Sequence, residues 1–133
     1  MSNMSMIIPY RKKGTTYQFL VKNETIVGWD QHPDLCGIAI AGPDEVMEKG
    51  LVDKLKADLG FVIEPSDFIH LGVCAMKRAS EHICYLYAVD LTKRVELDES
   101  KMGDYLWAYD DKLMESIDSQ LLACYARLRH LVL

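Results

Sequence analysis

The side chains of this sequence that could do chemistry include four carboxylates in one short segment. Glu45, Glu48, Asp53 and Asp58 lie within fourteen positions of one another. Hard divalent cations such as magnesium bind oxygen ligands, so several acids on one helix face would hold such an ion. Whether these acids can share one ion depends on the structure of the segment that carries them.

Residues 45–59 are predicted to form one amphipathic helix. The glycine, proline and aspartate at 42–44 suit a helix start, because proline is tolerated in the first turn and acids favour the positive end. Gly60 provides a natural C-terminal stop. Apolar side chains recur at helical spacing and predict one buried stripe: Met47, Leu51, Val52, Leu55 and Leu59.

On this helix the four acids cannot form one cluster. Glu45 and Glu48 lie roughly 20 and 15 Å from Asp58 along the axis, and Asp53 projects about 140° away from it. Lys54 precedes Asp58 by one helical turn and shares its face. Asp58 is therefore either paired with Lys54, in a surface ion pair contributing roughly 0.3–0.5 kcal/mol, or a surviving metal ligand.

The rest of the chain supplies strands on both sides of this helix and a last helix from about Asp118. Branched and aromatic residues mark the strand-like segments, which are 4–10, 17–21, 35–41, 68–76, 82–89 and 105–109. This order predicts an α/β (α+β) fold, with a mixed β-sheet packed between helices. One core accounts for 133 residues, so we expect a single domain spanning 1–133.

The cysteines are predicted to be buried, reduced thiols. Cys36, Cys74, Cys84 and Cys124 have no CxxC spacing and lie in apolar segments. The late hairpin has its turn centred near Ala79, which places Cys74 opposite Cys84. We therefore expect two neighbouring free thiols at this pair rather than a disulfide.

Charge and hydropathy exclude several classes of partner. The net charge of -5 and the pI near 5.3 argue against an extended nucleic acid as the ligand. No apolar run approaches the roughly 18 residues that cross a bilayer, so no membrane partner is expected. The first residues lack the pattern of a signal peptide, and we expect a cytoplasmic protein.

The segment of residues 39–61, AIAGPDEVMEKGLVDKLKADLGF, matches the spacing of a known motif without a gap. The motif is G-x5-E-x7-R-E-U-x-E-E-x-G-U, with U an apolar residue, and it defines the Nudix hydrolases. The matching positions are Glu45, Leu55, Asp58, Gly60 and Phe61. Because the preceding hairpin, the late strand and the last helix also follow the family's order, the chain resembles a Nudix protein over nearly its whole length.

The departures from this motif fall on positions that the family uses for catalysis. Ala39 replaces the opening glycine, Asp53 the arginine, and Lys54 and Ala57 two of the three helix glutamates. The resemblance implies cleavage of a diphosphate linked to another group, usually in a nucleotide, with Mg²⁺ or Mn²⁺ held by several carboxylates. Since only Asp58 remains, we expect a Nudix-fold protein with catalysis lost or weakened, acting as a nucleotide-binding or interaction module.

An active, divergent Nudix phosphohydrolase (a pyrophosphatase) is the alternative. Glu99 lies in a predicted loop before Trp107, where family members often place a further glutamate. Asp58 and Glu99 would then be the catalytic residues and would hold a weakly bound Mg²⁺ or Mn²⁺ ion, completed by the substrate's phosphates. Metal binding distinguishes this alternative from the non-catalytic module.

The resemblance also implies where a ligand would bind. The family's pocket lies on the sheet beside the motif helix, where aromatic side chains stack on a base. By position, the candidates to bind a nucleotide-like small molecule are Tyr17, Phe19, Trp29 and Trp107. A homodimer is common in this fold and is a further expectation.

Overall fold

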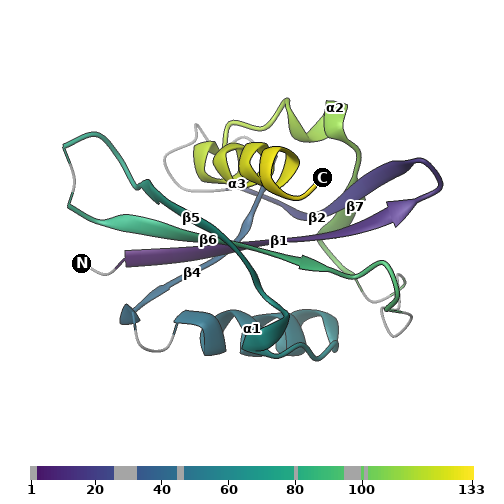
Figure 1. Ribbon diagram of the computed structural model, residues 1–133, viewed down its shortest axis with the longest axis horizontal. Coiled ribbons are helices and arrows are strands. Elements are labelled where there is room, and N and C mark those ends of the chain that lie inside the picture. The colour runs from purple at the N-terminus through teal and green to yellow at the C-terminus, as the bar shows by residue number, and fades with distance from the viewer. Residues whose placement is uncertain (1–2, 26–32, 45–46, 80, 95–99, 101) are drawn as a thin grey trace.

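The computed structural model describes residues 3–25, 33–44, 47–79, 81–94, 100 and 102–133. Its centre is a mixed seven-stranded sheet with helices on both faces (Figure 1). This arrangement is the α/β (α+β) fold that the order of predicted elements indicates. No helix among the described residues is long and apolar enough to cross a membrane.

Strand β1 (Asn3–Lys13) is the central strand and has three neighbours. It pairs antiparallel with β2 (Thr16–Thr25), which completes the predicted N-terminal hairpin, and parallel with β6 (Ile83–Asp90). Its first half also pairs antiparallel with β4 (Ile38–Gly42). The outer strands are β3 (Pro33–Cys36) and β7 (Tyr105–Ala108), which pair with β2, and β5 (Ile69–Ala75), which pairs with β6.

The prediction of one strand over residues 35–41 is wrong, because the chain changes neighbours at Gly37. Before this residue β3 pairs with β2, and after it β4 pairs with β1. The crossing passes so close to the Met6 side chain of β1 that a Cβ atom at Gly37 would lie 2.4 Å from Met6 Sδ. An apolar run indicates that a segment is buried, but it does not indicate where the segment exchanges one partner strand for another.

Helices cover the two faces of the sheet (Figure 1). On one face lies α1 (Met47–Leu59), followed by the short 3-10 helix η2 (Pro65–Asp67). On the other lie α2 (Asp110–Leu113), which the sequence did not indicate, and α3 (Ser119–Leu131). The helix expected over 45–59 is confirmed from Met47 onward; Glu45 lies outside the described residues.

The predicted apolar stripe is the surface by which α1 packs on the sheet. Met47, Leu51, Leu55 and Leu59 are buried, whereas Val52 is only half-buried at the edge of the same core. Gly60 ends the helix with φ +72°, and its N–H donates to the Lys56 carbonyl oxygen at 2.9 Å. Because Leu55 and Leu59 are buried at this end of the helix, the polar face of its last two turns lies beside β2 and β7.

The expected pairing of Cys74 with Cys84 is confirmed, and both thiols are free. Cys74 is half-buried, whereas Cys36, Cys84 and Cys124 are buried. Burial also raises the pKa of Cys84 to about 12.

We predict that iodoacetamide labels Cys74 in the folded protein at least about tenfold faster than the other three cysteines, because labelling needs an accessible thiolate. Peptide mass mapping of the native and urea-unfolded protein measures this; equal native labelling of all four would contradict it.

Candidate functional site

The polar face of α1 carries Lys54 and Asp58, and β2 and β7 bring further polar side chains to it. Lys54 Nζ lies 3.4 Å from Asp58 Oδ2, and the Tyr105 hydroxyl donates to the same oxygen at 2.5 Å. Lys22 Nζ lies 5.5 Å from the centroid of the Tyr105 ring and 3.0 Å from Glu24 Oε2. From β2 to α1 the four charged groups therefore alternate in sign, in the order Glu24, Lys22, Asp58 and Lys54.

These contacts shift the pKa values of Asp58, Tyr105 and Lys22. The hydrogen bond from Tyr105 and, after it, the charge of Lys54 lower the pKa of Asp58 in spite of its partial burial. Burial and the bond to Asp58 raise the pKa of Tyr105, so its hydroxyl remains a proton donor. The hydrogen bond to Glu24 raises the pKa of Lys22. Each charge thus has a partner within the network.

Within the part of the chain that the structure describes, this arrangement does not offer a divalent metal ion a set of ligands. Mg²⁺ needs several oxygen ligands, and among the described residues no three His, Cys, Asp or Glu side chains are grouped to hold an ion. The oxygen of Asp58 that would be offered already accepts from Tyr105 and Lys54, and the Lys54 ammonium repels a second cation beside it. Glu99, the other predicted ligand, lies outside the described residues.

Removing the Tyr105 hydroxyl tests the network. Because the folded-state pKa of Asp58 is lowered, this bond stabilises the fold above the unfolded pKa of about 3.9 and loses that contribution as the pH falls through the folded value. Tyr105→Phe should therefore lower the free energy of unfolding by roughly 1.5 kcal/mol at pH 7 and by less at acidic pH. Urea unfolding at both pH values measures it, with the exposed Tyr109→Phe as control. An equal loss at both pH values would refute the role assigned to Asp58.

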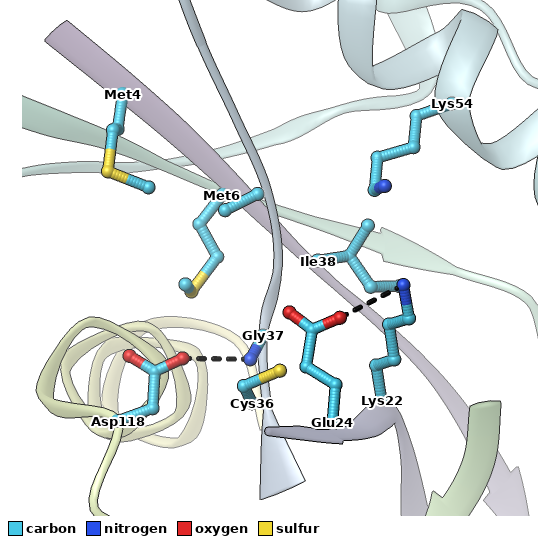
Figure 2. Close-up of a pocket in the computed structure, with 10 residues that line it drawn as sticks. Met4, Met6, Lys22, Glu24, Cys36, Gly37, Ile38, Lys54 and Asp118 are labelled. Atoms are coloured by element: carbon cyan, nitrogen blue, oxygen red, sulfur yellow. Dashed lines mark hydrogen bonds and ion pairs between the residues drawn. The ribbon is translucent and has the colours of Figure 1, made fainter. Parts of the chain in front are cut away.

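A pocket of about 300 Å³ lies beside this network, where β1 and β2 diverge and the chain crosses from β3 to β4. Lys22, Glu24 and Lys54 line it together with Met4 and Met6. Figure 2 shows the three charged side chains on one side of the crossing segment, with Lys54 pointing from α1 toward the Lys22–Glu24 pair, and the two thioethers on the other. The pocket is thus lined at one end by paired charges and at the other by apolar side chains.

Asp118, the N-cap of α3, fixes the crossing segment that divides this pocket. Its Oδ1 accepts hydrogen bonds from the N–H groups of Gln120 and Leu121, both at 3.1 Å, as expected for a helix cap. Its Oδ2 accepts from the Gly37 N–H at 2.9 Å, a contact visible in Figure 2. Only 4% of Asp118 is exposed. One buried carboxylate therefore joins the start of a helix to the point where the strand changes neighbours.

Cys36 also lines the pocket, but its environment does not suit a nucleophile. Only 1% of the residue is exposed. Burial, reinforced by the negative charge of Glu24, raises the pKa of Cys36 to about 12. Since the thiolate is the reactive form, this sulfur contributes a neutral, weakly polar wall.

The aromatic residues predicted to bind a ligand do not form one site. Phe19 is fully buried in the core beneath α3, so its prediction as a ligand contact is wrong. Tyr17 lies on that same face of the sheet, whereas Trp107 packs on the opposite face, where the Arg11 guanidinium lies 4.1 Å from its ring centroid. Trp29 lies outside the described residues. Of the predicted site residues that the structure describes, only Asp58 takes part in the network beside the pocket.

Apart from Lys54, the charged and thioether residues that line the pocket were not indicated by the sequence. Lys22 and Glu24 lie at the end of a strand and resemble ordinary solvated residues, and Met4 and Met6 resemble core residues of β1. The pattern marks Asp118 only as a helix start, which is half of its role. No spacing rule signals the other half, because the Gly37 contact joins segments far apart in the chain.

Comparisons of sequence find no relative: no protein-family model matches the chain, and no curated protein matches it either. Solved structures do match. The C-terminal domain of mouse MUTYH, in complex with human PCNA, superimposes with a TM-score of 0.76 at 9% identity, over 98% of this chain and 88% of that one. The NUDIX domain of Shewanella oneidensis NrtR, complexed with ADP ribose, gives 0.67 at 11% identity, over 98% and 87%.

A Caenorhabditis elegans Ap4A hydrolase also matches, with a TM-score of 0.62 at 11% identity, over 98% of this chain and 99% of that one. A longer NrtR chain, complexed with a 27mer DNA, is matched over 61% of its length. These likenesses and the mixed sheet between helices show that the chain has the Nudix fold. At such identities the comparison establishes the architecture alone.

Proposed function

We propose that this chain is a Nudix-fold binding module that has lost the hydrolysis of diphosphates. The observation that carries the proposal is the pairing of Asp58, whose Oδ2 receives both the Lys54 ammonium at 3.4 Å and the Tyr105 hydroxyl at 2.5 Å. In the motif of this fold, positions 54, 57 and 58 carry glutamates that hold the metal. Here the first is a lysine that neutralises the third, and the second is an alanine.

The proposed binding site is the pocket between the charged network and the thioethers of Met4 and Met6. Its volume of about 300 Å³ lies at the lower end of the range for small-molecule sites. An NrtR domain of the same fold binds ADP ribose, which supports a nucleotide-like small molecule as the ligand class. Gly37 of the crossing segment also lines the pocket.

Turnover and metal binding by the purified protein test the proposal. We expect hydrolysis of ADP ribose, dinucleoside polyphosphates and nucleoside triphosphates at background level with Mg²⁺ or Mn²⁺, and calorimetry should detect no tight metal site. A Nudix hydrolase assayed in parallel verifies the assay. Metal-dependent hydrolysis that Asp58→Ala abolishes would contradict the proposal and support the alternative, a divergent pyrophosphatase using Mg²⁺ held by Asp58 and Glu99.

A further inference from the structure

The charges around the pocket already satisfy one another. Lys22 is 3.0 Å from Glu24, Lys54 is 3.4 Å from Asp58, and Asp118 accepts three backbone N–H groups. A phosphate at either ammonium group would have to share it with the carboxylate that is already bound there. A ligand that brings no charge does not compete with these carboxylates.

The formal charge of the site gives the same answer. The two lysines and two carboxylates that line the pocket cancel, and Asp58 behind Lys54 leaves the group at net -1. A phosphomonoester carries about -1.5 to -2 at pH 7, so its entry would add like charge to a half-buried site. Such a charge is disfavoured unless new partners compensate it. The electrostatics therefore oppose a phosphorylated ligand and are indifferent to a neutral one.

The other walls of the pocket suit a planar ring. Met4 and Ala39, which are only partly buried, supply apolar surface, and thioether sulfur makes favourable contacts with aromatic rings. The volume of about 300 Å³ is at the small end for ligand sites. At the polar end, ammonium groups donate and carboxylates accept hydrogen bonds, which matches the mixed donor and acceptor edge of a nucleobase.

We infer that this pocket takes an uncharged planar heterocycle, a nucleobase or its nucleoside, in preference to the phosphorylated form. This inference rests on the proposed function, since it names the ligand class of the same site. The ring lies against Met4 and Ala39, and its polar edge meets Lys22, Glu24 and Lys54. Hydrogen bonds from the base to these paired charges then give specificity. Discrimination against phosphate arises because the positive charges around the pocket are already balanced by carboxylates.

Calorimetric titration of the full chain, in EDTA, tests the inference. The probes are adenosine, guanosine, cytidine and uridine, each with its 5′-monophosphate, and ADP ribose. At least one nucleoside should bind about tenfold or more tightly than its monophosphate, because the monophosphate adds charge to a site that is already balanced. Equal or tighter binding of the monophosphates, or no binding of any nucleoside, would overturn the inference.

Two variants separate charge balance from shape. Glu24→Gln leaves Lys22 unpaired, so the preference for the nucleoside should fall about tenfold as phosphate gains a partner. Met4→Ala removes apolar wall and should weaken the nucleoside and its monophosphate equally. Lys49→Gln changes an exposed lysine that does not line this pocket and should change the affinity for neither the nucleoside nor its monophosphate. Thermal melting verifies that each variant is folded.

An unchanged preference for the nucleoside in Glu24→Gln would contradict the electrostatic argument. Metal-dependent hydrolysis would instead contradict only the proposed function, so the two failures are distinguishable.

Discussion

Replacing Lys54 and Ala57 by glutamate is expected to give this protein a measurable affinity for Mg²⁺ and Mn²⁺. Lys54→Glu removes the ammonium group that now lies 3.4 Å from Asp58, and Ala57→Glu adds an acid next to it. The carboxylates at 57 and 58 then lie three and four positions after the one at 54, on adjoining faces of α1, and at both spacings helix side chains are neighbours. Calorimetry should detect binding with a dissociation constant of about 1 mM or lower, which corresponds to roughly 4 kcal/mol.

The same double variant should be less stable than the unmodified protein when metal is absent. Three like charges on one face repel, at a cost of roughly 0.2–0.5 kcal/mol per pair, and bound metal should restore the loss because it binds only the folded state. Lys54→Gln tests whether loss of the ammonium group alone is enough, and Lys56→Glu adds an acid at an exposed neighbouring position. Neither should gain metal affinity. Equal metal binding by Lys56→Glu would show that net charge, rather than this cluster, is responsible.

Much of the fold follows from local patterns that the sequence displays directly. The buried stripe of α1 and its stop at Gly60 could be predicted because both depend on spacing and on one glycine conformation. The pairing of Cys74 with Cys84 could be predicted because the turn position sets the register of a hairpin. The exchange of strand partners at Gly37 could not, since it depends on how close β1 passes.

The candidate site was predictable only where it depends on one helix. The pairing of Lys54 with Asp58 follows from their separation by one helical turn, and the structure confirms it. Tyr105 and Lys22 come from two strands that meet only in the folded sheet, so no spacing along the chain indicates their contact with this pair. Phe19 illustrates the opposite error, because a strand aromatic suits a ligand pocket and a core equally well, and here it is core.

Asp118→Ala is expected to cause a large loss of stability, about 1.5–5 kcal/mol in the free energy of unfolding. The first part is the helix cap, since the N–H groups of Gln120 and Leu121 lose their acceptor, at a cost of roughly 0.5–2 kcal/mol. The second part is the Gly37 N–H, a donor in the pocket wall that would be left unpaired, at a cost of roughly 1–3 kcal/mol. Urea unfolding followed by circular dichroism measures the sum.

Asp118→Asn separates the two roles of this residue, because it keeps one acceptor oxygen and turns the other into a donor. If the remaining oxygen caps α3, the new amide meets the Gly37 N–H donor to donor, and the crossing between β3 and β4 loses its anchor. We therefore expect Asp118→Asn to lie between the unmodified protein and Asp118→Ala in stability, yet to bind nucleosides as weakly as Asp118→Ala does. Ligand binding that survives in Asp118→Asn, or in folded Asp118→Ala at low temperature, would mean that the pocket does not depend on this anchor. The functional importance of Asp118 would then reduce to that of an ordinary helix cap.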